Sequence, residues 1–188
     1  MNEMDKENSI IDKTKNYLKI TKSIRIKLFI VFLIFNIIVT LVGVLTPLSS
    51  DIAQAIIEQI EPLFENLSTS LIIGNNLSIA LIAIIPIVGL FWMIFTLYST
   101  GLAFSAIATV SDVPALFLIL FTFITPFFWL EYIAYSLAMM EGTMIVYTLL
   151  IKRERIREEL IITILIIGLM TLLLAFGALL EALMIGIM

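Results

Sequence analysis

The basic residues of this chain are confined to two stretches, and this restricts the folds that are open to it. All 11 lysines and arginines lie between residues 6 and 27 or between residues 152 and 157. The sequence is strongly apolar, since 61% of its 188 residues are hydrophobic and 14% are charged, with a mean hydropathy of +1.14. Long apolar runs bounded by basic residues indicate membrane-crossing helices. The sequence therefore predicts an all-α, polytopic transmembrane helical bundle.

The lengths of the apolar runs predict about five crossings, at about 20 residues for each. We place them at residues 26–48, 72–89, 90–110, 115–151 and 160–186. Residues 1–25 form a basic amphipathic segment, suited to an anionic membrane surface or to a solvated tail, and residues 26–188 form the transmembrane domain. Basic loops stay in the cytoplasm. We therefore expect a multi-pass protein of the cell membrane with a cytoplasmic N-terminus and an external C-terminus.

Residues 50–66 have a different pattern from the runs on either side. Ile52, Ile56 and Ile60 recur at helical spacing and are interspersed with acidic residues. This spacing predicts an amphipathic helix. We expect it on the external surface, where it would rest on the lipid headgroups, dock a partner or cover the bundle.

Residues 115–151 are too long for one simple crossing, because a continuous helix of this length would extend roughly 55 Å. Pro126 is the expected break, and the pattern fits a broken helix or a re-entrant hairpin. Glu131 follows this proline inside the same apolar run. A glutamate near the bilayer centre costs roughly 2.5–3.5 kcal/mol on insertion scales. Glu131 is therefore a candidate functional residue, unless it serves as a polar contact between helices.

Other polar or small residues inside the apolar runs are candidates for functional or structural roles beside Glu131 and Pro126. They are Glu181, Glu141, Asn75, Asn76 and Gly101. We expect Glu131 and Glu181 to approach one another or to share a polar seam of the bundle, because each follows a proline or small residues. We expect Asn75 and Asn76 to begin the second span.

The chain has no cysteine and no histidine. This removes disulfides, thiolate chemistry, histidine acid–base catalysis and the usual zinc ligands. An intramembrane enzyme would have only carboxylates and hydroxyl groups to work with, and no Gly-x-Asp or Ser–Lys arrangement lies in a span. We therefore expect no metal, no cofactor, no enzymatic activity and no binding of nucleic acid.

Four short motifs follow one another along the apolar runs. In chain order they are the pair Asn75-Asn76, the pair Thr100-Gly101, the segment Pro126-Phe-Phe-Trp-Leu-Glu131 and, after small residues, Glu181. Their order and spacing resemble the stage II sporulation protein M family of bacterial and archaeal integral membrane proteins. The resemblance covers residues 26–188.

The resemblance is partial at two of these motifs. Thr100 stands where the family has asparagine, and Phe127 and Phe128 stand where it has a His-Gly pair. Chemistry based on that histidine therefore does not carry over to this chain. In spore-forming bacteria the family is implied to act in an engulfment complex beside peptidoglycan-degrading partners.

The resemblance implies a non-enzymatic subunit that anchors or assembles a membrane complex. Such a subunit would contact the lipid bilayer and either a membrane-protein partner or further copies of itself. The alternative is a small transporter or ion-pathway component that uses Glu131 and Glu181. Broken helices and buried carboxylates are typical of ion sites near the membrane midplane.

Overall fold

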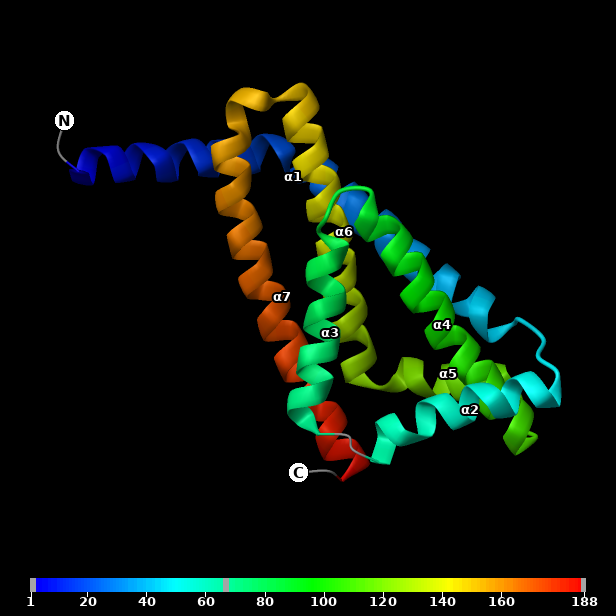
Figure 1. Ribbon diagram of the computed structural model, residues 1–188. Helices are drawn as coiled ribbons and strands as arrows, with labels where there is room; N and C mark the ends of the chain where they lie inside the picture. Colours follow the sequence, from blue (N-terminus) through cyan, green and yellow to red (C-terminus); the bar gives the residue numbers. More distant parts are fainter. Residues whose placement is uncertain (1–2, 66–67, 187–188) are drawn as a thin grey trace.

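The structure is a computed structural model that describes the backbone of residues 3–65 and 68–186 and the side chains of residues 10–62 and 68–186. The described elements are all helical, which confirms the all-α prediction (Figure 1). They are α1 (Glu3–Val44), α2 (Ser50–Glu65), α3 (Thr69–Ala83), α4 (Val88–Ser111), α5 (Ala115–Ile124), α6 (Pro126–Ile151), the 3-10 helix η1 (Arg153–Arg155) and α7 (Ile156–Ile185).

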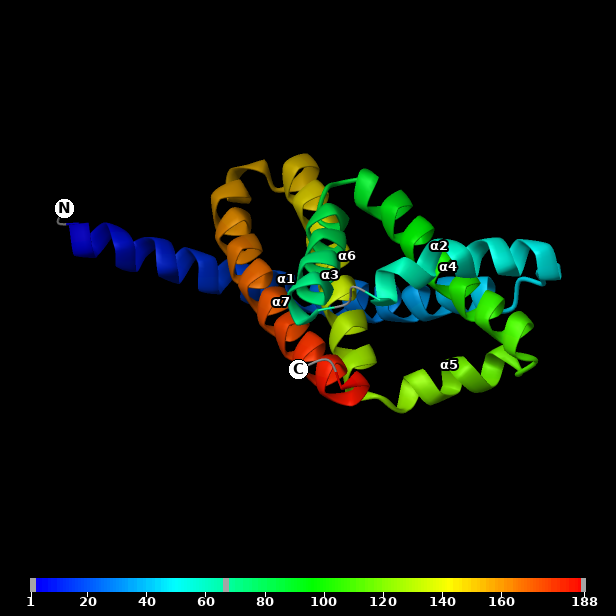
Figure 2. The same cartoon turned by 60° about the horizontal axis from the view of Figure 1, so that its bottom comes forward.

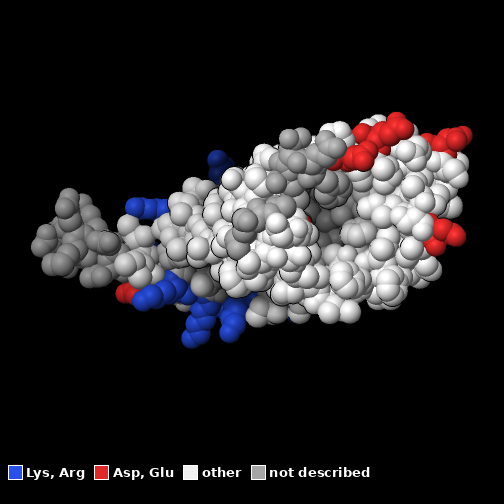
Figure 3. Space-filling model, turned by 90° about the horizontal axis from the view of Figure 1, so that it is seen from below, with Lys and Arg blue, Asp and Glu red and all other residues white. Residues whose placement is uncertain are grey.

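Five of the described helices run between the two ends of the molecule, and α2 and α5 lie across one end (Figures 1 and 2). We refer to that end as the acidic end, because α2 exposes Asp51, Glu58 and Glu61 there. The opposite end holds the α6–α7 turn, where Lys152 and Arg153 are exposed, and is the basic end. Figure 3 shows acidic and basic side chains gathered on different sides of the molecule.

Helix lengths identify a multi-pass membrane protein. Four helices of the described chain are long and apolar enough to cross a membrane, namely α1, α4, α6 and α7. The apolar helices α3 and α5 are shorter, with 15 and 10 residues. α6 is the central helix, because 56% of its membrane-length segment is buried inside the protein, against 17–28% for the other three. It packs against α1, α3 and α7.

In the apolar part of α1, residues 28–44, the side chains of Asn36 and Thr40 are buried and many apolar side chains are exposed, whereas the described lysines before it are exposed. The buried polar side chains of α1 include Thr21, Arg25, Asn36 and Thr40. Its exposed side chains include isoleucines and valines at positions 24, 26, 30, 31, 34, 38 and 42. A water-soluble helix has the opposite arrangement, whereas a helix whose outer face meets lipid tolerates polar groups only on its inner face. The arrangement of α1 therefore agrees with a membrane environment.

The predicted spans 72–89 and 90–110 correspond to α3 and α4, which are separated at residues 84–87, around Pro86, so their bounds differ from the prediction. α3 begins at Thr69, where Ser68 accepts a hydrogen bond from the Leu71 amide at 3.4 Å, and it ends at Ala83. Asn75 and Asn76 therefore lie inside α3, and the prediction that they begin the span is wrong. The Ser68 cap starts the helix earlier because its hydroxyl satisfies an exposed amide.

The predicted break at Pro126 is confirmed. α5 ends at Ile124 and α6 begins at Pro126, a position where a missing amide hydrogen costs no helical bond. The Trp129 indole donates across the break to the Phe123 carbonyl oxygen at 2.8 Å. α5 lies across the acidic end in both views (Figures 1 and 2). The 115–151 run is thus a broken helix with a sharp bend.

The predicted amphipathic helix over residues 50–66 is α2, whose last described residue is Glu65, and Asn66 lies outside the described residues. α2 packs against α4. Ala53 is fully buried, Ile56 and Ile60 are half-buried, and Ile52 is exposed. The buried face of α2 is therefore the one that carries Ala53, because the small alanine side chain permits close packing against α4.

Two glycines allow α1 and α4 to touch through their backbones. A Cβ added to Gly101 would lie 2.8 Å from the Gly43 Cα and would overlap the Thr40 carbonyl oxygen. A Cβ added to Gly43 would lie 2.9 Å from the Gly101 Cα. Small residues at such crossings let transmembrane helices pack closely. Gly101, a candidate site residue in the sequence, therefore has a packing role.

Gly101→Ala is expected to lower stability by about 1–3 kcal/mol, the usual effect of overpacking. The added methyl group meets backbone atoms of α1, which cannot move aside as a flexible side chain would. Gly168→Ala is the matched control, because a Cβ there meets nothing within 4 Å. Thermal unfolding of both variants in detergent micelles measures the effect. Equal melting temperatures would show that the α1–α4 contact is not close.

Candidate functional site

A buried ion cluster joins α1, α6 and α7 near the basic end. The Arg25 Nη1 atom donates to Glu141 Oε2 at 2.7 Å, and its Nη2 atom donates to both Glu159 carboxylate oxygens at 2.7 Å. The Arg25 side chain is 7% exposed and both glutamates are 0% exposed. One guanidinium group therefore faces two carboxylates that are shielded from solvent. We refer to these three residues as the Arg25 cluster.

Hydroxyl groups complete the bonding of the Arg25 cluster. Thr163 donates to Glu141 Oε1 at 2.6 Å, and Thr148 donates to Glu159 Oε2 at 3.2 Å. The Arg25 Nε atom donates to Thr21 at 3.2 Å. Tyr17 and Thr148 share a hydrogen bond of 2.7 Å. Each carboxylate oxygen of the cluster thus accepts at least one hydrogen bond, which a buried charge requires.

Polar contacts continue between α1 and α6 toward the acidic end. Asn36 Nδ2 donates to the Ser136 hydroxyl at 3.2 Å, and the Thr40 and Tyr132 hydroxyls are hydrogen-bonded. Together with the bonds of Tyr17 and Arg25 to α6, these contacts form the α1–α6 polar seam. The seam fixes α1 against the central helix, because each of these groups would lose its partner if either helix shifted along its axis.

Glu131 lies near the start of α6 and bonds to α3. Its Oε1 atom accepts a hydrogen bond from Asn76 Nδ2. The Tyr135 hydroxyl donates to Asn76 Oδ1 at 3.1 Å, and Asn75 Nδ2 donates to the same oxygen at 3.3 Å. The Asn76 amide is therefore held from both of its ends, and it directs its N–H group at the carboxyl group of Glu131.

Glu181 of α7 interacts electrostatically with Glu131. Both side chains are half-buried, and Glu181 makes no hydrogen bond to any described residue. No lysine or arginine occurs between residues 28 and 151 or after residue 157, so α3, the part of α6 near Glu131 and the part of α7 near Glu181 carry none. Two carboxylates that interact without a basic residue nearby repel each other. A shared proton or a bound cation lowers that repulsion. We refer to Glu131, Glu181, Asn76 and Tyr135 as the Glu131 site.

The candidate residues from the sequence fall into separate places. The structure brings Glu131, Glu181, Asn75 and Asn76 together, while Gly101 lies at the α1–α4 crossing. Glu141 belongs to the Arg25 cluster, and Pro126 lies exposed at the start of α6. Sequence reasoning missed Arg25, Glu159 and Tyr135. The one available signal was the helical spacing of Tyr17, Thr21 and Arg25, which places three polar side chains on one face.

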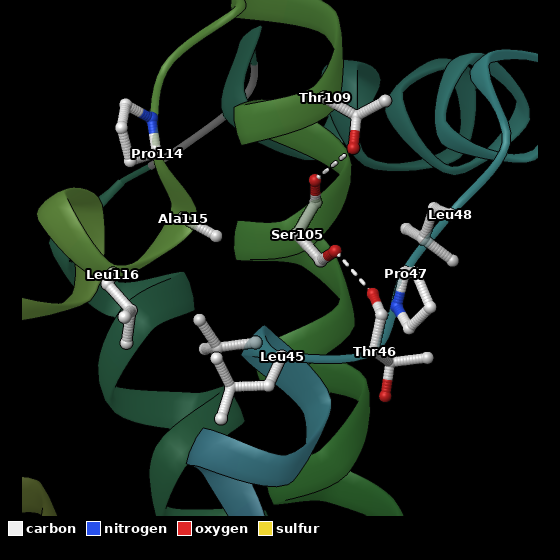
Figure 4. Close-up of a pocket in the computed structure, with 10 residues that line it drawn as sticks. Leu45, Thr46, Pro47, Leu48, Ser105, Thr109, Pro114, Ala115 and Leu116 are labelled. Carbon is white, nitrogen blue, oxygen red and sulfur yellow. Dashed lines mark hydrogen bonds between the residues drawn. The ribbon is translucent and has the colours of Figure 1, made fainter.

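A recess of the protein lies away from both clusters. It measures about 460 Å³ and lies between the end of α1, the last turns of α4 and the start of α5 (Figure 4). The Ser105 hydroxyl donates to the Thr46 carbonyl oxygen at 2.7 Å, and Thr109 donates to the Ser105 carbonyl oxygen at 2.8 Å. These polar groups already have partners. Among the described residues, no group of three or more acidic side chains is placed to hold a metal ion.

Arg25→Met is expected to destabilise the fold by about 3–5 kcal/mol, because it leaves two buried carboxylates without their cation. The triple variant Arg25→Met, Glu141→Gln, Glu159→Gln is expected to recover most of this loss, since no buried charge remains. Arg153→Met, at an exposed position, is the control. Melting temperatures in detergent test the expectation, which fails if Arg25→Met is as stable as Arg153→Met.

Comparisons with known proteins leave the family open. No protein-family model matches the chain, and neither a curated protein nor a solved structure matches it. The similarity to the stage II sporulation protein M family therefore rests on the short sequence motifs, and it stays a prediction. The function has to be argued from the geometry of this molecule.

Proposed function

We propose that this chain is a non-enzymatic integral membrane subunit that anchors or assembles a larger membrane complex. The observation that carries the proposal is α5. This helix exposes Phe117 by 64%, Phe121 by 62% and Ile124 by 82%, and it buries only Ile119. With 10 residues it is too short to cross a membrane. An exposed apolar face on such a helix suits packing against another membrane protein.

The distribution of the polar groups supports a structural subunit. The Arg25 cluster and the α1–α6 polar seam join helices to one another. Most of their polar groups are hydrogen-bonded within the bundle. The recess of about 460 Å³ is lined mainly by apolar residues and backbone. A rigid bundle with outward-facing apolar surfaces is what a scaffold needs.

The acidic end is the side on which we place the partner. α2 exposes Asp51, Glu58 and Glu61 at this end, where α5 also lies, and no basic residue lies in either helix. Such a surface favours a partner with basic residues near the membrane. The positive-inside rule assigns this end to the outside of the cell membrane. The resemblance to the stage II sporulation protein M family, whose members are implied to act in membrane complexes, agrees with this role.

Affinity purification from the membranes of the source organism, followed by mass spectrometry, tests the proposal. We expect a membrane protein to copurify in a fixed ratio, or the chain to be recovered as a defined oligomer. The double variant Phe117→Ala, Phe121→Ala is expected to lose that association by at least tenfold while keeping its melting temperature, because both side chains are exposed hot-spot candidates.

The matched control for the α5 variant is Leu165→Ala, Leu172→Ala on α7, where both side chains are exposed by 65% and 70%. It removes comparable apolar surface from a long crossing helix. The proposal fails if the wild-type chain is recovered as a monomer without a partner. It also fails if the α5 and α7 variants lose the association equally.

Transport of a proton or an alkali cation is the second candidate function. The observation that favours it is the Glu131 site, where the carboxyl groups of Glu131 on α6 and Glu181 on α7 interact electrostatically and no basic residue is near them in the sequence of either helix. Asn76 Oδ1, the Tyr135 hydroxyl and the carboxylates would offer only oxygen ligands, which hard cations prefer. The site lies next to the bend at Pro126, and broken helices are common at transport sites.

Flux measurements in proteoliposomes distinguish the two candidates. If the chain transports, Glu131→Gln and Glu181→Gln each reduce proton or cation flux at least tenfold, because they remove the charge that binds the ion. Glu154→Gln, at an exposed position of the α6–α7 turn, is the control and keeps the flux. Flux no higher than in protein-free liposomes would leave the subunit function as the sole proposal.

A further inference from the structure

The turn between α3 and α4 is apolar throughout. Residues 79–95 contain no charged residue, and the turn itself reads Ile84-Ile-Pro-Ile-Val88. Ile85 is 49% exposed, Ile87 74% and Val88 54%. The other turn near the basic end, between α6 and α7, is built from lysine, arginine and glutamate. The two turns therefore suit different surroundings, one of them apolar and the other aqueous.

Along the axis between the two ends of the molecule, the α3–α4 turn lies nearer to the acidic end than the α6–α7 turn does (Figure 1). The Ile84 carbonyl oxygen packs against Gly142 of α6, 2.6 Å from where an alanine Cβ would be. Gly142 stands nine residues before the end of α6 at Ile151, which is about 14 Å of helix. α3 itself, with 15 residues, extends roughly 22 Å, less than the roughly 30 Å of the hydrocarbon layer.

Four amides of the turn are bonded within the hairpin, while the Ile87 amide has no acceptor among the described residues. The amides of Ile84 and Ile85 donate to carbonyl oxygens of α3 at 3.3 and 3.0 Å. The Val88 amide donates to the Pro86 carbonyl oxygen at 2.7 Å, and the Gly89 amide to Ile85 at 2.8 Å. Pro86 has no amide hydrogen to satisfy. In lipid an amide has no water to bond, so the internal bonding of these four amides agrees with an apolar environment.

Ile87 holds a strained conformation at the tip of this turn. Its φ of 67° and ψ of −56° form a γ-turn, closed by the hydrogen bond from Val88 to Pro86. A β-branched residue rarely adopts a positive φ, and glycine would adopt it without strain. Apolar surroundings would stabilise the exposed Ile87 side chain and so offset the strain of its backbone.

We infer that the α3–α4 turn lies within the hydrocarbon layer of the membrane, with Ile85, Ile87 and Val88 in contact with lipid acyl chains. The hairpin of α3 and α4 thus ends inside the bilayer on the side of the basic end. An apolar recess of about 220 Å³ lies beside the turn, between Phe32, Leu90 and Val146. Its lining suits an acyl chain. The inference does not depend on the proposed function.

The chain has no cysteine, so a single introduced cysteine carries a unique spin label. Purified Ile87→Cys, reconstituted in liposomes of phosphatidylcholine and phosphatidylglycerol, is examined for collisions of the label with oxygen and with a water-soluble nickel chelate. We expect high oxygen and low nickel accessibility, as for the lipid-facing reference Leu172→Cys. Arg153→Cys in the α6–α7 turn is expected to show the opposite pattern.

Nickel accessibility at Ile87→Cys equal to that at Arg153→Cys would overturn the inference, because the turn would then lie in water. Protection from both reagents would also overturn it, since protein and not lipid would cover the turn. Val88→Cys provides a second label position if Ile87→Cys does not fold.

A pair of charge substitutions tests the same inference without a label. Ile87→Asp is expected to reduce the yield of folded, membrane-inserted protein roughly tenfold, because a charge in the hydrocarbon layer opposes insertion. Ile151→Asp is the matched control, since Ile151 is 63% exposed beside Lys152 at the basic end. Its yield is expected to stay near that of the wild-type chain. Equal yields of the two variants would contradict the inference.

Discussion

The bond from Arg25 to Glu141 and Glu159 is the interaction on which the rest of the bundle depends. Apolar packing between transmembrane helices is weakly directional, because lipid tails are as apolar as the side chains that would replace them. A guanidinium group with 2.7 Å bonds to carboxylates on two other helices is directional and is not screened by water. It fixes the register of α1 against α6 and α7. The bonds of Asn36 and Thr40 to α6 then follow at that register.

Once α1 is fixed, the positions of the remaining helices follow from short backbone contacts. Gly43 of α1 and Gly101 of α4 permit a close crossing of the two helices. α4 in turn positions the α3–α4 turn, which packs through the Ile84 carbonyl oxygen against Gly142 of α6. Gly142 directly follows Glu141 of the Arg25 cluster. The ion cluster and the apolar turn therefore contact α6 at the same level, through two consecutive residues.

Sequence reasoning recovered the features that depend on local patterns and missed those that depend on partners. The helical class, the break at Pro126 and the amphipathic α2 follow from the lengths of apolar runs, from proline and from helical spacing. Arg25 resembled a basic residue at the boundary of a span, and Glu159 resembled a loop charge. The sequence around Arg25 and Glu159 does not indicate that their side chains are buried, because tertiary packing determines which groups a charged side chain contacts. Glu131 was identified because a carboxylate inside an apolar run is unusual without any knowledge of its partners.

The buried carboxylates of the Arg25 cluster and the half-buried ones of the Glu131 site differ in a way that bears on function. Every carboxylate oxygen of the Arg25 cluster has a hydrogen-bond donor, so the fold itself accounts for Glu141 and Glu159. Glu131 has one donor, from Asn76, and Glu181 has none among the described residues. A fold gains little from two adjacent carboxyl groups that lack a cation, since uncharged residues of similar size would pack there at lower cost. The bonds within the fold therefore account for the Arg25 cluster, and they leave the Glu131 site able to take up a bound ion, a proton or a partner residue.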